Sequence, residues 1–262
     1  METSTSASRF WRWLLPAAVA GCLYVNYLYN VHPPAGALSN GAMSARHPTL
    51  LTPAGYAFSI WGVIFAGLVA YTVWQLLPAQ RFSRLVARLT PVLALAVLAT
   101  TAWTLVFSYE LIGPSLVVML AILGLLAVAY ARSRPLVLAG QAPAWPTWFL
   151  SLYLGWIMLA TVLNVIFGLR DAAGVQWPAD ANLLGSHALV VVAAGLGTAL
   201  AWRGHDALLP LPLAWGLVGT WAAQRGAAPH LATTALGAAV ALGVGAVLAI
   251  WSRQRQPRPQ MG

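Results

Sequence analysis

Residues 111–131 read LIGPSLVVMLAILGLLAVAYA, and none of these 21 side chains is charged. A helix of about 20 mostly apolar residues crosses the roughly 30 Å hydrocarbon core of a lipid bilayer. A barrel strand is shorter and alternates lipid-facing with lumen-facing residues, which this uniformly apolar run does not do. The stretch therefore predicts a transmembrane helix.

Similar stretches fill the rest of the chain. Of its 262 residues, 60% are hydrophobic and 7% are charged, whereas a soluble domain has about 25% charged residues. Since a water-soluble globule cannot bury so much apolar surface, the composition excludes a soluble enzyme, a nucleic-acid-binding domain and a disordered chain. Charge-free runs predict eight transmembrane helices, at about 10–30, 53–77, 88–109, 112–132, 147–170, 184–202, 207–223 and 230–252. We therefore predict an all-α polytopic membrane protein.

The basic residues, all 14 of which are arginines, predict how the chain is oriented. With eight spans, one side of the membrane carries both termini and 11 of the 14 arginines, and the other side carries Arg46, Arg170 and Arg225. The positive-inside rule then places both termini in the cytoplasm. This bias and attraction to anionic membrane lipid explain the net charge of +9 without a nucleic-acid partner. The lack of lysine and the abundance of Ala, Gly and Arg suit a GC-rich genome, so we expect a bacterial cytoplasmic membrane.

Residues that could carry catalysis are few. The sequence contains no metal-binding Cys/His cluster and no nucleophile or phosphate-binding motif. Glu110 ends the third predicted helix, where we interpret it as a solvated interfacial residue. His187 lies early in the sixth predicted helix; a histidine there is a candidate proton or ligand contact, but more often a packing residue. We therefore expect no catalytic residue and no metal site.

The single cysteine, Cys22, follows Val19-Ala20-Gly21, a small-residue pattern like the one that precedes the lipidated cysteine of bacterial lipoproteins. The apolar run continues beyond Cys22, where a lipoprotein usually becomes polar. We therefore favour an uncleaved first helix, with lipidation of Cys22 as the alternative.

The 13 tryptophans fall into two groups. Most lie near predicted helix ends or in loops, as in the aromatic belt of membrane proteins. Trp61, Trp103, Trp156 and Trp215 lie inside predicted helices. Their rings could pack as core or line a cavity for a flat hydrophobic ligand, and composition alone leaves both open.

Two local sequences resemble the TspO/translocator protein (TspO/MBR) family, the tryptophan-rich sensory proteins. The first is LTPAGYAFSIW at 51–61, in which Pro53, Phe58 and Trp61 keep the spacing of the family's second helix. Ala54 stands where the family has a second proline, and Leu51 stands where it has a tryptophan.

The second is YLGWIMLATVLN at 153–164, in which Tyr153, Trp156 and Asn164 match the family's fifth helix, while Leu152 replaces a proline. The third-helix signature survives only as Trp103 and Phe107. Two motifs in the right order, on the second and fifth of five helices, make the resemblance fairly specific.

The resemblance implies a five-helix bundle over residues 1–170, with a pocket that opens toward the loop after the first helix. Residues 171–262 then form three additional transmembrane helices and a basic C-terminal tail. Such a pocket implies a flat or rigid hydrophobic ligand: a porphyrin, haem or a sterol-like molecule. By position, the expected ligand-binding residues are Pro53, Tyr56, Phe58, Trp61, Trp103, Phe107, Tyr153, Trp156 and Asn164.

These observations favour a membrane binding or sensory protein without a covalent cofactor. A small transporter or permease for such ligands is the first alternative, and a porphyrin-degrading enzyme is the second. The altered pocket mouth argues against extending the degrading activity to this chain. The resemblance also implies a homodimer, although the glycine-rich additional helices could replace that interface or mediate self-association.

Overall fold

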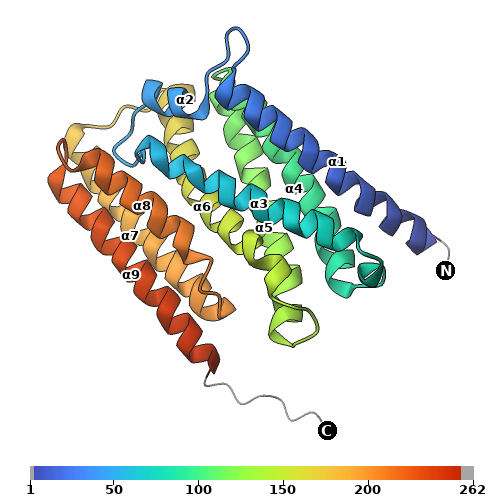
Figure 1. The fold of residues 1–262 in the computed structure, drawn as a ribbon. Coiled ribbons are helices and arrows are strands. Elements are labelled where there is room, and N and C mark those ends of the chain that lie inside the picture. Colours follow the sequence, from blue (N-terminus) through green and yellow to red (C-terminus); the bar gives the residue numbers. More distant parts are fainter. Residues whose placement is uncertain (1–2, 255–262) are drawn as a thin grey trace.

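The computed structural model describes residues 3–254, and in this part of the chain helices are joined by loops, without strands (Figure 1). The first five long helices are α1 (Thr3–Val31), α3 (Ile60–Leu76), α4 (Arg84–Ser108), α5 (Ile112–Leu138) and α6 (Trp148–Phe167). The last three are α7 (Ala179–Gly204), α8 (Pro210–Gln224) and α9 (Pro229–Gln254). The predicted all-α fold and its order of eight long helices are therefore confirmed.

Five shorter elements lie between these helices. They are α2 (Asn40–Arg46), the 3-10 turns η1 (Gly55–Ser59), η2 (Pro78–Gln80) and η3 (Trp145–Thr147), and the π-helical turn η4 (Gly168–Ala172). Helix α2 lies between the first two long helices, outside the predicted helices. The turn η1 occupies residues 55–59, where the sequence predicted the start of the second long helix (53–77), so that α3 itself begins only at Ile60.

Helix boundaries differ from the prediction where arginines were taken as helix ends. The third long helix begins at Arg84 and not near 88, because the Ser83 hydroxyl caps it by accepting a hydrogen bond from the Val86 N–H. The fourth continues to Leu138, past Arg132 and Arg134. A long basic side chain can leave the hydrocarbon layer while its backbone stays helical, so a charge marks the membrane boundary and not the helix end.

Helix α8 is shorter than the other long helices. Seven helices of the described part are long and apolar enough to cross a membrane, and α8 is not one of them. Its 15 residues span about 22 Å at 1.5 Å per residue, less than the roughly 30 Å of hydrocarbon. The predicted seventh span is thus present as a helix, but a short one.

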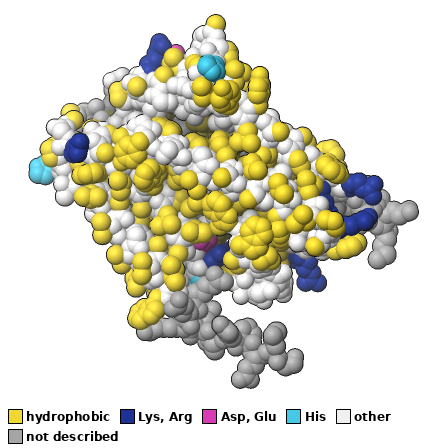
Figure 2. Space-filling view, in the orientation of Figure 1, with side chains coloured by type: hydrophobic (Ala, Val, Ile, Leu, Met, Phe, Trp, Pro, Cys, Tyr) yellow, Lys and Arg dark blue, Asp and Glu magenta, His cyan; other side chains and the backbone are white. Residues whose placement is uncertain are grey.

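The chain runs back and forth between two ends of the bundle (Figure 1). Helix α1 begins and α9 ends at the same end, together with the α3–α4, α5–α6 and α7–α8 connections. Arg81 lies in the α3–α4 connection, and Arg84, Arg134 and Arg203 lie in the helical turns next to these connections. Arg255 and Arg258 of the basic tail fall outside the described residues. Figure 2 shows hydrophobic side chains covering the middle of one face and basic side chains near its edges. This arrangement is that of a multi-pass integral membrane protein.

Small residues allow the long helices to approach one another. Gly67 of α3 is an example, because a Cβ at this position would lie 2.3 Å from the Phe149 Cβ of α6. The core between these helices contains fully buried aromatic side chains, including Tyr71, Phe149 and Tyr153.

A buried carboxylate joins the α7–α8 turn to the first five helices. Asp206 is 3% exposed, and its Oδ2 accepts hydrogen bonds from the Tyr130 hydroxyl (3.0 Å) and the Ser151 hydroxyl (2.7 Å). Arg134 NH1 lies 3.6 Å from the same oxygen. Arg134 also donates from Nε to the Gly204 carbonyl at 2.7 Å. Helices α5 and α6 are therefore bonded to the end of α7 and to the α7–α8 turn.

At the opposite end, α8 holds the segment that leads into α3. The Ala54 N–H donates to the Gly219 carbonyl (3.0 Å) and the Thr220 hydroxyl donates to the Leu51 carbonyl (2.9 Å). Trp215, the mid-helix tryptophan without an assigned role, donates from Nε1 to the Ala57 carbonyl at 2.9 Å. Three hydrogen bonds thus hold residues 51–57 against the short helix, and we call these contacts the α8 clamp.

Candidate ligand-binding site

A small cavity of about 30 Å³ lies between η1, α3, α4, α5 and α6. Seven of the nine residues expected to bind a ligand line it: Pro53, Phe58, Trp61, Trp103, Phe107, Trp156 and Asn164. The other wall residues are Ser44, Met119, Leu159, Ala160, Leu163 and Phe167. We call this space the aromatic cavity.

Helical periodicity places these side chains on facing surfaces. On α6, Trp156, Ala160 and Asn164 recur every four residues and therefore share one face. On α4, Trp103 and Phe107 are also four apart, and their rings stack with centroids 4.6 Å apart. Phe58, from η1, meets the Trp156 ring edge-on at 5.9 Å. Aromatic faces from three elements thus surround one space.

Asn164 is the polar centre of the aromatic cavity and is 3% exposed. Its Oδ1 accepts a hydrogen bond from Trp103 Nε1 at 3.2 Å, with the Ser115 hydroxyl at 3.5 Å. Its Nδ2 donates to the Ala160 carbonyl at 2.9 Å. An amide group can make about four hydrogen bonds, so a ligand that bonds to Asn164 would use its remaining capacity or replace Trp103.

The two other expected residues lie beside the aromatic cavity and do not line it. Tyr153 is buried behind the wall, where its hydroxyl bonds to Thr100 and its ring meets Trp61 edge-on at 5.7 Å. Tyr56 is 46% exposed and packs against the Trp215 ring at 5.4 Å. Tyr153 therefore supports the wall, and Tyr56 belongs to the contact between η1 and α8.

The size of the aromatic cavity limits what it holds in this conformation. A volume of about 30 Å³ equals the share of one water molecule in the liquid. Sites for small organic ligands measure about 300–1,000 Å³. A ligand of macrocycle size therefore requires part of the wall to move.

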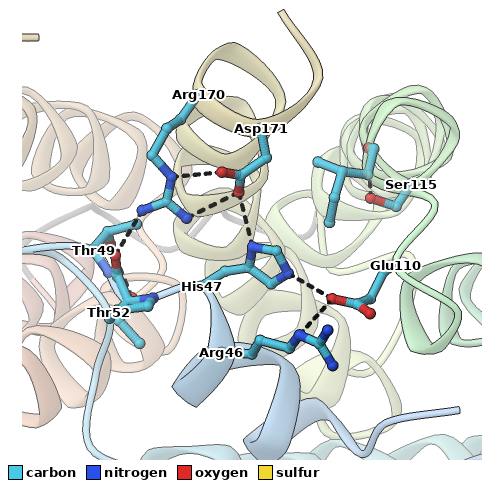
Figure 3. Close-up of polar contacts among 10 residues, drawn as sticks. Arg46, His47, Thr49, Thr52, Glu110, Ser115, Arg170 and Asp171 are labelled. Atoms are coloured by element: carbon cyan, nitrogen blue, oxygen red, sulfur yellow. Dashed lines mark hydrogen bonds and ion pairs between the residues drawn. The ribbon is translucent and has the colours of Figure 1, made fainter. Parts of the chain in front are cut away.

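Five charged or titratable residues form a cluster of polar contacts (Figure 3). We call them the charged cluster: Arg46, His47, Glu110, Arg170 and Asp171. Glu110 Oε1 lies 3.1 Å from Arg46 Nε and 3.0 Å from His47 Nε2. His47 Nδ1 lies 3.0 Å from Asp171 Oδ2, and Arg170 bonds to both oxygens of Asp171.

The charged cluster joins three segments that are far apart in the sequence. They are the end of α2, the α4–α5 turn and η4. A carboxylate only accepts hydrogen bonds, so His47 donates to both neighbours only as the imidazolium. The His47 ring centroid lies 6.2 Å from that of Phe167, a wall residue of the aromatic cavity. The cluster therefore fastens residues 46–48 over the cavity, with Arg170 NH1 also donating to the Pro48 carbonyl at 2.7 Å.

Sequence reasoning missed this cluster and interpreted Glu110 as a solvated interfacial residue. The one available signal was topological, because Arg46, Glu110 and Arg170 lie in connections on the same predicted side of the membrane. Glu110 also has a left-handed backbone (φ 58°), which a non-glycine residue adopts rarely and often at functional positions. That conformation is visible only in the structure.

Other candidate residues take no part in the site. His187 Nδ1 donates to the Leu183 carbonyl of its own helix at 2.8 Å, which supports the packing interpretation. Within residues 3–254, no group of three or more His, Cys, Asp or Glu side chains is arranged to hold a metal ion.

A family model described as TSPO-like protein matches residues 12–248. The matched range contains the aromatic cavity and the charged cluster, and it continues past residue 170 through α7, α8 and most of α9. No curated protein and no solved structure matches the chain.

Proposed function

Because the chain belongs to the TSPO-like protein family, we propose that it is a membrane binding protein for a flat hydrophobic ligand, such as a porphyrin or haem. The ligand binds among Trp61, Trp103 and Trp156. One observation carries the proposal: side chains from η1, α3 and α6, which the two motifs selected, line a single cavity together with Trp103 and Phe107 of α4. Tryptophan faces suit a planar macrocycle, and Asn164 supplies a directional hydrogen bond in a water-poor site.

Ligand entry requires residues 39–48 to move, because Ser44 is a wall residue and His47 fastens this segment to Glu110 and Asp171. The ion pairs that resist this movement are partly exposed; the Arg46 side chain is 62% exposed and that of Glu110 is 34% exposed. Such pairs contribute about 0–1 kcal/mol each. A micromolar ligand supplies about 8 kcal/mol, so ligand binding can offset the cost of opening.

The test is a titration of the purified protein with protoporphyrin IX, followed by tryptophan fluorescence and by porphyrin absorbance. We expect saturable quenching without loss of porphyrin absorbance. Trp156→Leu removes one ring of the cavity, so its affinity should fall about tenfold, equivalent to about 1.4 kcal/mol. Trp202→Phe is the matched control, because Trp202 is 53% exposed on α7, away from the cavity.

Unchanged fluorescence in the wild type would refute the porphyrin proposal. Equal affinities of Trp156→Leu and Trp202→Phe would place the ligand elsewhere. Progressive bleaching of the porphyrin under illumination would instead indicate turnover, and uptake into sealed vesicles would indicate transport.

A further inference from the structure

His47 lies between two carboxylates, and each of its ring nitrogens faces one of them (Figure 3). Nδ1 lies 3.0 Å from Asp171 Oδ2, and Nε2 lies 3.0 Å from Glu110 Oε1. The imidazolium has two N–H donors, whereas the neutral ring has one donor and one acceptor. In the neutral ring, one nitrogen lone pair would therefore face a carboxylate oxygen at hydrogen-bond distance, which is repulsive.

Each carboxylate also has an arginine partner, so His47 is the link between two ion pairs. At the end of α2, Arg46 pairs with Glu110 of the α4–α5 turn (3.1 Å), and within η4 Arg170 pairs with Asp171 (2.7 Å). An arginine does not lose its proton in a protein. Deprotonation of the histidine therefore leaves both ion pairs in place and breaks one of the two bonds that join them.

The two ends of residues 39–48 are held by different kinds of contact. At the start, the Leu38 N–H donates to the Ser108 carbonyl at 2.8 Å, and neither of these backbone groups titrates. At the end, the charged cluster holds residues 46–48. A change of protonation in the cluster therefore loosens one end of this segment and leaves the other end attached.

Residues 39–48 lie against the aromatic cavity. Ser44 is one of the wall residues, and the ring of Phe167, another wall residue, lies 6.2 Å from that of His47. Because a cavity of about 30 Å³ admits a larger molecule only when its wall moves, the contact that holds this segment controls how often the cavity opens.

We propose that the charged cluster is a pH-sensitive latch on residues 39–48, closed while His47 is the imidazolium and loosened when the ring loses its proton. Opening then becomes more frequent as the pH rises. Histidine is the side chain that ordinarily changes charge between about pH 5 and pH 8, so the latch responds to physiological changes in pH. Control of porphyrin entry by the latch rests on the function proposed above, whereas the latch itself does not.

Hydrogen exchange of the purified full-length protein, measured at about pH 6 and about pH 9, tests the latch without a ligand. Both values lie well above the range in which carboxyl groups ordinarily titrate, about pH 4. The protection factor, which is the intrinsic exchange rate divided by the measured rate, removes the direct effect of pH on exchange. We expect the protection of residues 43–47, in and after α2, to fall about threefold to tenfold, as for one ionic hydrogen bond between partly exposed groups. The protection of α5 should not change.

Two variants assign the effect to His47. His47→Gln retains one N–H donor but cannot gain a proton, so its protection should be low at both pH values. Glu110→Gln presents an amide that can accept from the imidazolium or donate to the neutral ring, so its protection should lie below that of the wild type at pH 6 and change little with pH. His230→Gln is the matched control, because His230 is exposed in the first turn of α9 and this variant should keep the wild-type pH dependence.

The association rate of protoporphyrin IX, measured in wild type and His47→Gln at the same two pH values, tests whether the latch controls entry. We expect association to accelerate with pH in the wild type relative to His47→Gln. Equal protection of residues 43–47 at both pH values in the wild type, or an equal fall in His47→Gln, would overturn the latch. A fall in protection without faster association would overturn its control of entry. If the wild type binds no porphyrin, the proposed function fails, and the protection factors still decide the latch.

Discussion

Asp206 allows a direct test of how α7–α9 are attached to the rest of the chain. Replacing it with alanine removes a buried carboxylate that accepts from Tyr130, Ser151 and the Leu208 N–H, at 3.0, 2.7 and 3.0 Å. It also removes the partner of Arg134, which lies 3.6 Å away and has a side chain that is 13% exposed. Asp206→Ala therefore removes all the contacts by which this carboxylate links the α7–α8 turn to α5 and α6.

The expected loss of stability follows from these contacts. A hydrogen bond to a charged group contributes about 1.5–3 kcal/mol, and breaking a buried ion pair from one side costs about 3–5 kcal/mol. In the variant, Arg134 still donates hydrogen bonds to the carbonyls of Gly204 and His205. Its charge therefore keeps hydrogen-bond partners, and the loss of stability should lie at the lower end of the range for a broken ion pair. We expect a loss of about 3 kcal/mol for Asp206→Ala. Asp206→Asn retains an acceptor for Leu208 and should lose about half as much.

Thermal unfolding in detergent, followed by tryptophan fluorescence, measures this difference. At about 2–4 °C per kcal/mol for a chain of this size, Asp206→Ala should unfold about 6–12 °C below the wild type. Asp180→Asn is the control, because Asp180 is exposed in the first turn of α7 and surface changes stay within about 0.5 kcal/mol. If Asp206→Ala unfolds at the temperature of Asp180→Asn, the carboxylate does not hold the two parts together.

Three further predictions concern the α8 clamp and the charged cluster. Gly219→Ala should destabilise the protein by about 1–3 kcal/mol, because its Cβ would lie 3.0 Å from that of Ala57; an unchanged unfolding temperature would contradict the close approach. Trp215→Phe keeps the ring but loses the hydrogen bond to the Ala57 carbonyl, so hydrogen exchange of residues 54–59 should accelerate several-fold, and exchange at the wild-type rate would refute the clamp. Glu110→Gln breaks partly exposed ion pairs, one of them to His47, and should cost under about 1 kcal/mol while raising the rate of porphyrin association; slower association would argue against a closing role.

Much of the fold follows from the sequence because membrane helices are local structures. Each satisfies its own backbone hydrogen bonds, so hydropathy alone locates it, as at 112–132 within α5. Two motifs likewise identified side chains that meet at the aromatic cavity, since spacing along one helix determines which side chains share a face.

The parts that escaped prediction depend on contacts between distant segments. His47 is separated by 63 residues from Glu110 and by 124 from Asp171, and no local pattern connects them. The role of Trp215 also depends on a partner 158 residues away. The hollow of about 670 Å³ between α1 and the start of α3 is lined by Gly41, Gly55 and Gly62, which come together only when α1, α2 and α3 are packed.

The division of the chain at residue 170 and its orientation in the membrane remain predictions. The structure adds one constraint on how the two parts are oriented relative to each other. The family match extends to residue 248, beyond the division predicted at residue 170. The α7–α8 turn is bonded to α5 and α6, and α8 is bonded to residues 51–57. Reversing the membrane orientation of α7–α9 alone would break both sets of bonds, so the two parts must insert with matched topology.

The chain's only cysteine has a practical consequence. Cys22 is 1% exposed in the middle of α1, and Asn26 Nδ2 lies 3.5 Å from its sulfur. A maleimide reagent added to the folded protein should therefore leave it unmodified. Cysteines introduced at exposed positions can then carry spin labels or fluorophores in the otherwise native chain. The rate at which Cys22 itself is modified would measure how often α1 separates from its neighbours.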